Sequence, residues 1–433
     1  MIGGLPGKIR RYFVQQDHTG QATGWRNGGG WAMTLSVIVS GAGIGGLVAA
    51  LALHRRGFDV TVLEQADTLG EVGAGLQVSP NAVRVLRNLG LEDGLKQMAC
   101  TPEAFCGYDW ETGAELYRTP IGGTHQRLYG AGYYQVHRAD LHDLLSDALP
   151  ADRIRLGARV VRAGQDASSA HVELADGSVL TADVVVGADG IRSAVRDAVG
   201  TASPPAYTGM TAFRGLIPAD RLPPGIGRVA ANWQGPHGHI VHYYLRRYEI
   251  LNIVAIMEIA DWTEESWSLP VAPAEMLDLF RDWNPMIRQL LGLIAQPFRW
   301  GLYGRAPTQV WGRGRITLLG DAIHPMVPFL AQGAAMAMED GHVLAGILDR
   351  MRDNPVAALR AYEDARRPRA NRVQQGSLDR AATIHEPDAE KRAARNRAYR
   401  EMTEKNPEQT IHQAEWIYSY DPDAAIEDAL APV

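Results

Sequence analysis

The feature that most constrains this chain is an apolar run, a glycine-rich turn, a helix-forming stretch and a second apolar run, in that order. Residues 34–39 are β-branched and apolar, which is typical of a buried parallel strand. The sequence GAGIGG follows at 41–46, and residues 47–56 are good helix formers. Residues 59–63 form the second apolar run, which ends at Glu64. This order predicts a βαβ unit and therefore an α/β fold of the Rossmann type.

Each glycine of this turn has its own physical role. Gly41 permits a tight turn, Gly43 lets the backbone approach a pyrophosphate, and Gly46 allows close packing of helix on strand. The amino terminus of the helix then faces the phosphates. Glu64, with Gln65 beside it, stands where an acid accepts hydrogen bonds from an adenosine ribose. The pattern predicts a dinucleotide site, and the alternative is an ordinary glycine turn.

A second motif, far along the chain, has the composition needed at the other end of such a ligand. Residues 315–319 are predicted to form a buried strand, which leads to Asp321. Prolines, among them Pro328, then disfavour helix until Gly333 and Ala334, where a long helix is expected to begin. The positive end of that helix would stabilise an anionic reduced flavin, and Asp321 can accept from a ribityl hydroxyl. Together the two motifs predict one FAD held by both ends of the chain.

Residues between the motifs add candidate contacts to this cofactor. Gly75 belongs to a glycine-dense stretch, which lets backbone lie against a flat ligand. Arg138 precedes a helix predicted at 141–149, with Asp140 as its cap. The guanidinium of Arg138 would reach a phosphate or ribityl oxygen, or it would form a surface salt bridge.

A strand, a turn and a helix follow one another again later in the chain. Residues 184–186 are predicted to be a buried strand, and residues 192–198 a helix. Asp189 lies between them, in a position that is typical of a nucleotide contact. Taken alone, this segment would be only a turn.

Residues 204–310 differ in sequence pattern from the residues before them, and this pattern predicts an antiparallel sheet. Alternating runs at 238–246 and 249–257 surround a short connection. Because side chains alternate along a strand, His239 and Tyr243 share one face. A face that carries an imidazole and a phenol is a candidate for a small aromatic ligand, and the alternative is a solvated sheet face.

These patterns predict the domain organisation of a chain of 433 residues, which is long enough for two substantial domains. We expect the following division: 1–32, a disordered extension; 33–203 with 311–385, a discontinuous FAD-binding domain; 204–310, a substrate-binding antiparallel-sheet domain; and 386–433, a helical tail.

Composition excludes several classes of function. The formal net charge of −6 gives no electrostatic reason to expect nucleic acid. Cys100 and Cys106 are the only cysteines, too few for a disulfide framework or a zinc site, so no metal is expected. No apolar run approaches the roughly 20 residues of a membrane span. No secretory signal is evident either, so we expect a cytoplasmic protein without a membrane partner.

Three ordered motifs resemble those of the single-component FAD-dependent aromatic hydroxylases, the p-hydroxybenzoate hydroxylase-like group. They are GAGIGG with Glu64, the segment 187–190, and Gly320-Asp321 with His324-Pro325 and Pro328. The resemblance covers about residues 34–385. Within the group, the stretches 70–82, 137–141 and 366–369 are most similar to salicylate 1-monooxygenase and 3-hydroxybenzoate 6-hydroxylase. The segment 416–421 is similar to 6-hydroxynicotinate 3-monooxygenase.

The resemblance implies a reaction. NADH or NADPH would reduce the FAD, and dioxygen would give a C4a-hydroperoxyflavin that hydroxylates a small hydroxy- or carboxy-substituted aromatic, such as a salicylate or hydroxybenzoate. Water has to be excluded for this chemistry. Two alternatives stay open, namely a hydroxynicotinate-type ring as substrate and a non-catalytic FAD-fold binding protein. A homodimer is a candidate assembly.

The resemblance also implies residue roles. His239 matches a histidine that serves as base towards a substrate phenol, and Tyr243 matches a tyrosine that contacts substrate. The backbone carbonyl of Pro328 would face the reacting oxygen, and Arg214 would lie near flavin and substrate, unless it has an ordinary surface role. Gln77 stands where the hydroxynicotinate enzyme has a histidine, and Pro328 where the 3-hydroxybenzoate enzyme has a glutamine. These departures leave the substrate open.

Overall fold

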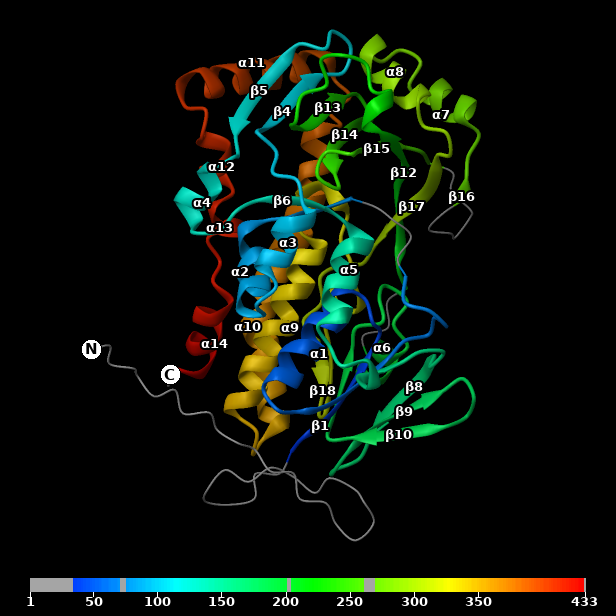
Figure 1. Ribbon diagram of the computed structural model, residues 1–433, viewed down its shortest axis with the longest axis vertical. Helices are drawn as coiled ribbons and strands as arrows, with labels where there is room; N and C mark the ends of the chain where they lie inside the picture. The colour runs from blue at the N-terminus through cyan, green and yellow to red at the C-terminus, as the bar shows by residue number, and fades with distance from the viewer. Residues whose placement is uncertain (1–33, 71–74, 201–203, 261–268, 432–433) are drawn as a thin grey trace, which may run out of the picture.

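The computed structural model describes residues 34–70, 75–200, 204–260 and 269–431. The stretch 1–32, for which we expected a disordered extension, lies outside the described residues. The molecule has two stacked parts, a parallel sheet with its helices and a broad, mainly antiparallel sheet above it (Figure 1). The expected α/β class, with a second antiparallel sheet, is confirmed.

The first part is built on a six-stranded sheet. In spatial order its strands are β18 (Gly312–Arg313), β19 (Ile316–Leu318), β11 (Val184–Gly187), β1 (Ser36–Ser40), β2 (Asp59–Leu63) and β7 (Ile154–Arg155). All neighbours are parallel except β18 and β19. The predicted βαβ unit is therefore confirmed, with α1 (Ile44–Arg55) between β1 and β2.

The helix α9 (Gly333–Arg350) packs closely on α1 because both helices carry small residues at the contact. A Cβ atom on Gly341 would lie only 2.7 Å from the backbone nitrogen of Ala49. This close approach brings the helix after the second motif against the helix after the first. The two predicted ends of the cofactor site thus belong to one layer of the fold.

The second part is an eight-stranded sheet. In spatial order its strands are β16 (Leu269–Pro270), β17 (Phe298–Gly304), β12 (Ala206–Pro218), β15 (Ile250–Glu258), β14 (Gly238–Leu245), β13 (Ala230–Gly235), β4 (Ala104–Asp109) and β5 (Glu115–Pro120). Only β13 and β4 pair in parallel. The strands β4 and β5 come from within 33–203, the stretch that we assigned to the FAD-binding domain.

Two smaller sheets lie beside these. Strands β8 (Val160–Gln165), β9 (Ala170–Leu174) and β10 (Val179–Ala182) form an antiparallel sheet, with Gly177 at a φ of +83° in the hairpin turn. Strands β3 (Gly75–Val78) and β6 (Tyr134–His137) form an antiparallel pair. Through this pair the glycine-dense stretch meets the strand that leads to Arg138.

The remaining elements are helical. They are α2 (Pro80–Asn88), α3 (Glu92–Met98), α4 (Thr124–Tyr129), α5 (Arg138–Asp147), α6 (Val195–Val199), α7 (Pro273–Leu279), α8 (Pro285–Gly292), α10 (Pro355–Ile384), α11 (Ala389–Lys405), α12 (Gln409–Gln413), α13 (Glu415–Tyr418) and α14 (Pro422–Leu430), with the single 3₁₀ turns η1 (Ala151–Arg153), η2 (Ala219–Arg221), η3 (Gly320–Ala322) and η4 (Pro328–Leu330).

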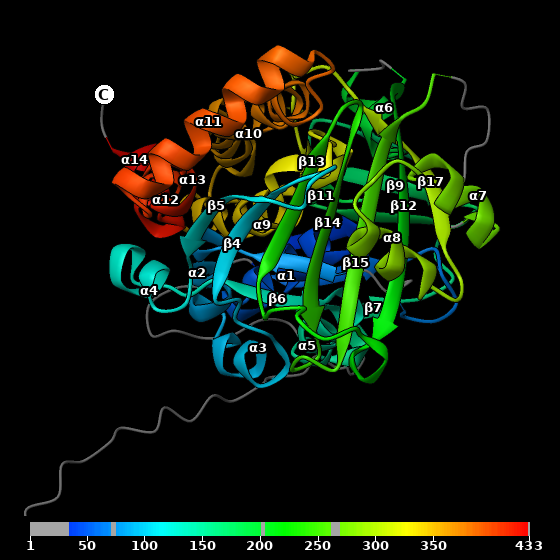
Figure 2. The same cartoon turned by 90° about the horizontal axis from the view of Figure 1, so that it is seen from above.

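The long helix α10 joins the two parts (Figure 1). It starts at Asn354, whose side chain accepts a hydrogen bond from the backbone N–H of Ala357 at 3.2 Å. It ends at the antiparallel sheet, where the carbonyl of His385 accepts from the N–H of His237 at 3.1 Å. Seen from above, α11 lies along the edge of that sheet, beside β5 (Figure 2).

The antiparallel sheet buries one face under α7 and α8. Ile240 and Tyr244 of β14 belong to the apolar cluster that includes Met276 and Leu290 of those helices. Because side chains alternate along a strand, His239 and Tyr243 lie on the opposite face. Both are buried as well, so the solvated-face alternative is wrong.

Two local predictions were wrong in detail. The helix predicted at 141–149 begins earlier, at Arg138, and Asp140 does not cap it; the carboxylate of Asp140 accepts instead from Arg246. The helix predicted at 192–198 begins later, at Val195. It does so because Asp189 accepts from the backbone N–H groups that start the helix, which fixes a non-helical turn before it.

Candidate active site

The turn of the first motif needs glycine at two positions for steric reasons. Gly41 has a φ of +103°, and a Cβ atom there would lie 2.5 Å from the carbonyl oxygen of Ala188. A Cβ atom on Gly46 would overlap the carbonyl oxygen of Gly41. Substitution at either position would therefore push the turn away from β11.

Gly43 differs, because a Cβ atom there would meet no atom within 4 Å. Gly43 is the N-cap residue of α1, and no side chain caps the helix. Backbone N–H groups at the first turn of a helix favour an anionic ligand. The open space beside Gly43 is what a pyrophosphate would occupy, so this turn fits the predicted cofactor.

Glu64 holds the turn and keeps acceptor capacity. One carboxylate oxygen accepts from the N–H of Ala42 at 2.8 Å, and the other from the N–H of Ala66 at 2.9 Å. A carboxylate has about four lone-pair sites, so further acceptor sites remain for ribose hydroxyls. Gln65, next to it, is exposed.

At the second motif, Asp321 and Arg138 lie close enough to interact electrostatically. Both side chains retain accessible surface, yet the protein surrounds them closely enough to desolvate them. Burial raises the pKa of Asp321, against the effects of His324 and Arg138. Burial lowers the pKa of Arg138, against the effect of Asp321. An accessible carboxylate and a partly accessible guanidinium suit the hydroxyls and phosphates of FAD.

The amino end of α9 follows the second motif. Gly333 and Ala334 are its first residues, and no side chain caps their N–H groups. The N-cap residue Gln332 instead bonds its side chain to Ser79 at 3.0 Å and to Asn81 at 3.0 Å. These buried bonds tie the start of α9 to the start of α2.

His324 belongs to the scaffold of the second motif. Its Nε2 lies 2.6 Å from Oδ2 of Asp340, which also accepts from the N–H of Gly320 at 3.0 Å. Nε of Arg366 donates to the other oxygen of Asp340 at 2.8 Å. Burial would raise the pKa of Asp340, but His324 and Arg366 lower it to about 2. An ionised Asp340 thus fixes the loop that carries Asp321.

The expected substrate residues meet on one face of β14. His239 and Tyr243 are 3% and 5% exposed. Gly75 lies against the Tyr243 ring, since a Cβ atom on Gly75 would be 2.5 Å from Cε2 of Tyr243. The hydroxyl of Tyr133 donates to the side-chain oxygen of Gln77, two residues along β3.

Arg214 and Pro328 complete this face. The Arg214 guanidinium lies 5.1 Å from the centre of the Trp300 ring, and no described carboxylate lies within 4.0 Å of it. The carbonyl of Pro328 accepts from the N–H of Ala331 at 3.0 Å, which closes the turn η4. Phe329 of that turn meets the His239 ring edge-on at 5.2 Å. The second motif and the sheet face therefore adjoin each other.

The sequence did not predict that His385 and Trp300 belong to the candidate site. Nε2 of His385 lies 2.7 Å from Nδ1 of His239, although the two residues are 146 positions apart. Trp300 lies on β17, under Arg214. Neither residue stands in a motif, so only the fold shows that they belong here.

Asp189 is placed differently from the other expected cofactor residues. Its Oδ2 accepts from the N–H groups of Ala194 at 2.8 Å and Val195 at 3.2 Å. Its Oδ1 has no hydrogen-bond partner among the described residues. Asp189 thus caps a turn through one oxygen and keeps the other free for a ligand.

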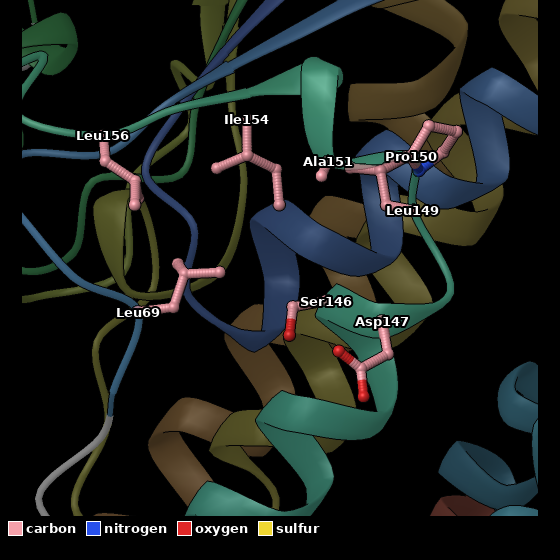
Figure 3. Close-up of a pocket in the computed structure, with 8 residues that line it drawn as sticks. All are labelled: Leu69, Ser146, Asp147, Leu149, Pro150, Ala151, Ile154 and Leu156. Carbon is pink, nitrogen blue, oxygen red and sulfur yellow. The ribbon is translucent and has the colours of Figure 1, made fainter.

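A hollow on the molecule is formed by eight residues (Figure 3). It is lined by Leu69, Ser146, Asp147, Leu149, Pro150, Ala151, Ile154 and Leu156. These side chains are mostly aliphatic, and none of the expected site residues is among them. We do not assign the hollow to the candidate site.

The described part of the chain holds neither a candidate metal site nor a candidate membrane span. No group of three or more His, Cys, Asp or Glu residues is arranged to hold a metal ion there. No helix in the same residues is long and apolar enough to cross a membrane.

Comparison with known proteins identifies the fold and its cofactor. The profile of the FAD binding domain family matches residues 34–377. The chain belongs to this family. It is 39% identical over 364 residues to the 3-amino-4-hydroxybenzoate 2-monooxygenase PtnB3 of Streptomyces platensis, which covers 84% of this chain and 91% of that protein.

Two further proteins support the same conclusion. The 6-hydroxynicotinate 3-monooxygenase of Bordetella bronchiseptica is 38% identical over 351 residues, which are 79% of this chain and 90% of that one. A salicylate hydroxylase solved with its substrate superimposes with a TM-score of 0.79 at 27% identity, covering 92% of this chain and 99% of that chain.

This flavoprotein is therefore a monooxygenase of the FAD-dependent aromatic hydroxylase class, which uses NADH or NADPH as co-substrate. The expected family, enzyme class and FAD cofactor are confirmed. The alternative of a non-catalytic FAD-fold binding protein is set aside, because these relatives are monooxygenases.

Proposed function

We propose that the enzyme hydroxylates a small aromatic ring that carries a hydroxyl group and a carboxylate. The observation that carries this proposal is that His239 and Arg214 lie on the same face of the antiparallel sheet. Nε2 of His239 forms no hydrogen bond with any described residue and is not sealed inside the protein, so it can accept a hydroxyl proton. The guanidinium of Arg214, without a described acidic partner, offers a counter-charge to a carboxylate.

The other substrate contacts orient the ring. Burial raises the pKa of Tyr243 above its ordinary value, so its phenol stays protonated and donates a hydrogen bond. Gln77, held by Tyr133, lies on the neighbouring β3. Phe329 and Trp300 add apolar walls that exclude water from the reacting atoms.

The cofactor would lie between the two motifs. Gly41, Gly43 and Gly46 would hold its pyrophosphate, and Glu64 with Gln65 its ribose. The ribityl chain and flavin ring would be held by Gly75, Arg138, Asp189, Asp321, Gly333 and Ala334. When bound, FAD supplies the redox chemistry by which NAD(P)H and dioxygen are used.

Pro328 contributes through its backbone. Its carbonyl closes the turn that places Phe329 against His239, and the resemblance puts this carbonyl near the reacting oxygen. In this proposal His239, Tyr243 and Pro328 form the catalytic group. Gln77 and Arg214 complete the binding of substrate.

A second candidate substrate is a hydroxynicotinate-type ring. The favouring observation is the likeness to the Bordetella enzyme, together with the docked segment 416–421 that resembles its class. Arg372 covers the Trp416 ring at 3.9 Å, and Arg369 covers the Tyr420 ring at the same distance. Both substrates present a ring hydroxyl and a carboxylate, so the same side chains would bind either.

We extend the proposal to domains, assembly and location. We propose three units: an FAD-binding domain of 33–203 with 311–385, a substrate-binding domain of 204–310 and a helical tail of 386–433. The strands β4 and β5 of the first unit join the large sheet. We propose a homodimer, which size-exclusion chromatography with light scattering would test. A cytoplasmic location is supported by the two unpaired, buried cysteines, since free thiols suit a reducing compartment.

The test of function is a screen by flavin reduction. The purified yellow protein would be mixed anaerobically with NADH or NADPH and each of 3-amino-4-hydroxybenzoate, 6-hydroxynicotinate, 3-hydroxybenzoate and salicylate. We expect at least one of these to accelerate reduction and to yield a hydroxylated product with oxygen. Phenol and benzoate, each lacking one group, are the controls. Equal acceleration by phenol would contradict the carboxylate requirement.

A further inference from the structure

Three side chains lead from the candidate substrate pocket to the surface. Nδ1 of His239 lies 2.7 Å from Nε2 of His385, and Nδ1 of His385 lies 3.4 Å from Oε1 of Glu258, within ion-pair distance but outside hydrogen-bond geometry. His239 and His385 are 3% and 1% exposed, whereas 44% of the Glu258 side chain is exposed. Polar atoms therefore form a line through an otherwise buried layer. The line starts at His239, on the face of β14 that carries the expected substrate residues, and ends at the partly exposed carboxylate of Glu258.

Backbone hydrogen bonds hold this line in place. The end of α10 is fixed on the turn before β14, since the carbonyl of His385 accepts from the N–H of His237 at 3.1 Å. The carbonyl of His237 in turn accepts from the N–H of Glu258 at 2.8 Å. Arg395 of α11 donates to the carbonyl of Thr383 at 2.8 Å, in the last turn of α10. Three separate elements thus converge on His385.

The charges around the line keep both imidazoles neutral. Burial lowers the pKa of His239, and His385 and Arg380 lower it further. Burial also lowers the pKa of His385; Glu258 opposes this effect, and His237 and Arg395 add to it. Nδ1 of His237 lies 2.8 Å from the second oxygen of Glu258. A neutral imidazole has one N–H and one acceptor nitrogen, which is what stepwise proton transfer needs.

We propose that His385 and Glu258 form a proton relay that carries the substrate's hydroxyl proton from His239 to solvent. This inference rests on the proposed function, because it assumes that the substrate carries an ionisable ring hydroxyl. His239 is the catalytic base in it. His385 and Glu258 do not touch the substrate, and they act through His239.

The transfer balances without any other reactant. The substrate O–H bond breaks as its proton binds Nε2 of His239, and the proton on Nδ1 of His239 moves to Nε2 of His385. The proton on Nδ1 of His385 moves to the carboxylate of Glu258, which exchanges it with water. Both imidazoles end neutral, with their tautomers reversed, and the substrate is left as the more electron-rich phenolate.

The test compares His385→Gln with His385→Leu. Glutamine can keep a hydrogen bond to Nδ1 of His239, but an amide cannot pass a proton on, whereas leucine removes both functions. With 3-amino-4-hydroxybenzoate, 6-hydroxynicotinate and 3-hydroxybenzoate as probes, we expect kcat to fall about tenfold in both variants with KM little changed. The loss should shrink as pH rises, because the free phenol then ionises without a base. Glu258→Gln should show the same trend.

Controls separate this relay from a structural role. His412→Gln alters an exposed histidine of α12, outside the line, and it should leave kcat unchanged. FAD content, read from visible absorbance, verifies folding of every variant. A His385→Gln enzyme with wild-type kcat across pH would overturn the relay. A loss of kcat of equal size at every pH would also overturn it. Such a loss would indicate a distorted site, because distortion lowers kcat whether or not the substrate phenol is already ionised.

A second measurement does not need turnover. The proton shared by His239 and His385 should give a downfield N–H resonance in histidine-labelled wild-type enzyme, and it should vanish in His239→Ala and His385→Leu. Its absence from the wild type would overturn the relay. Failure of all three probes to accelerate flavin reduction would instead contradict the proposed function, whatever the resonance shows.

Discussion

Asp321 and Asp340 both lie near the imidazole of His324, yet their pKa values move in opposite directions. Burial raises the pKa of Asp321, which borders the space for the cofactor. Asp340 accepts from His324 and Gly320 and pairs with Arg366, so its pKa falls to about 2 despite complete burial. Asp340 therefore has the hydrogen-bond donors of a structural carboxylate. Asp321 has fewer, as expected of a carboxylate that binds a ligand.

Asp340 should contribute stability that is lost in acid. Its pKa is lower in the folded state than the ordinary 3.8, so the contribution is present above pH 3.8 and disappears as pH falls towards 2. The shift corresponds to about 2 kcal/mol. Asp340→Asn should therefore be less stable at pH 7 and should lose stability less steeply between pH 4 and 2, measured by urea unfolding. Asp364→Asn, an exposed carboxylate of α10, controls for loss of charge.

His239→Ala should separate cofactor binding from chemistry. The side chain lies on the sheet face and not in the glycine turn, so FAD should remain bound. Hydroxylation of phenolic substrates should slow by roughly a hundredfold, because the general base is gone. The measurement is the turnover rate per bound flavin, with bound flavin read from visible absorbance. Unchanged turnover across pH would remove His239 from the mechanism.

Gly43→Val should give a folded but colourless protein. A side chain there meets no protein atom, so the fold should tolerate it, but it would fill the space beside the first turn of α1. Gly123→Val is a matched control, since a Cβ atom there also meets nothing and the position is remote from the motifs in sequence. Absorbance near the flavin bands with circular dichroism decides the matter. A fully yellow Gly43→Val protein would contradict the pyrophosphate site.

At the scale of elements, the sequence correctly predicted the strands and helices that depend on residues close together in the chain. The strands β1 and β2 and the helix α1 follow from apolar periodicity and glycine positions, and they form where expected. The start of α5 was missed because Asp140 looks like a cap, although its carboxylate bonds to Arg246 of a distant turn. The pairing of β4 with β13 and the contact of His385 with His239 join remote segments, and no local signal encodes them.

Arg369 makes several of the contacts that dock the carboxyl-terminal segment on α10. Arg369 donates to Glu339 at 2.8 Å and to the carbonyls of Trp416 at 2.8 Å and Ile417 at 2.9 Å. Arg369→Met should lower stability by about 2 kcal/mol and expose the segment to proteases. Arg367→Met, which removes a neighbouring arginine paired with exposed Asp364, should do neither. Thermal unfolding and limited proteolysis measure both effects.

At the scale of the whole molecule, the proposed cofactor site draws on both halves of the chain. The turn at 41–46 and the segment 321–334 lie in one layer because α1 and α9 pack together. Removal of FAD should therefore lower the melting temperature of the protein, and added FAD should raise it in proportion to the logarithm of its concentration. Differential scanning calorimetry of apoprotein with increasing FAD tests this. A melting temperature independent of FAD would contradict a site shared by both motifs.

The order of strands in the parallel sheet has a consequence during translation. β11 has β1 on one side and β19 on the other, and β19 is made more than a hundred residues later. A nascent chain that has emerged only as far as β11 must present an open strand edge to solvent until Leu318 leaves the ribosome. Exposed edges invite wrong pairing, so stalled or truncated chains should bind chaperones while full-length ones escape them.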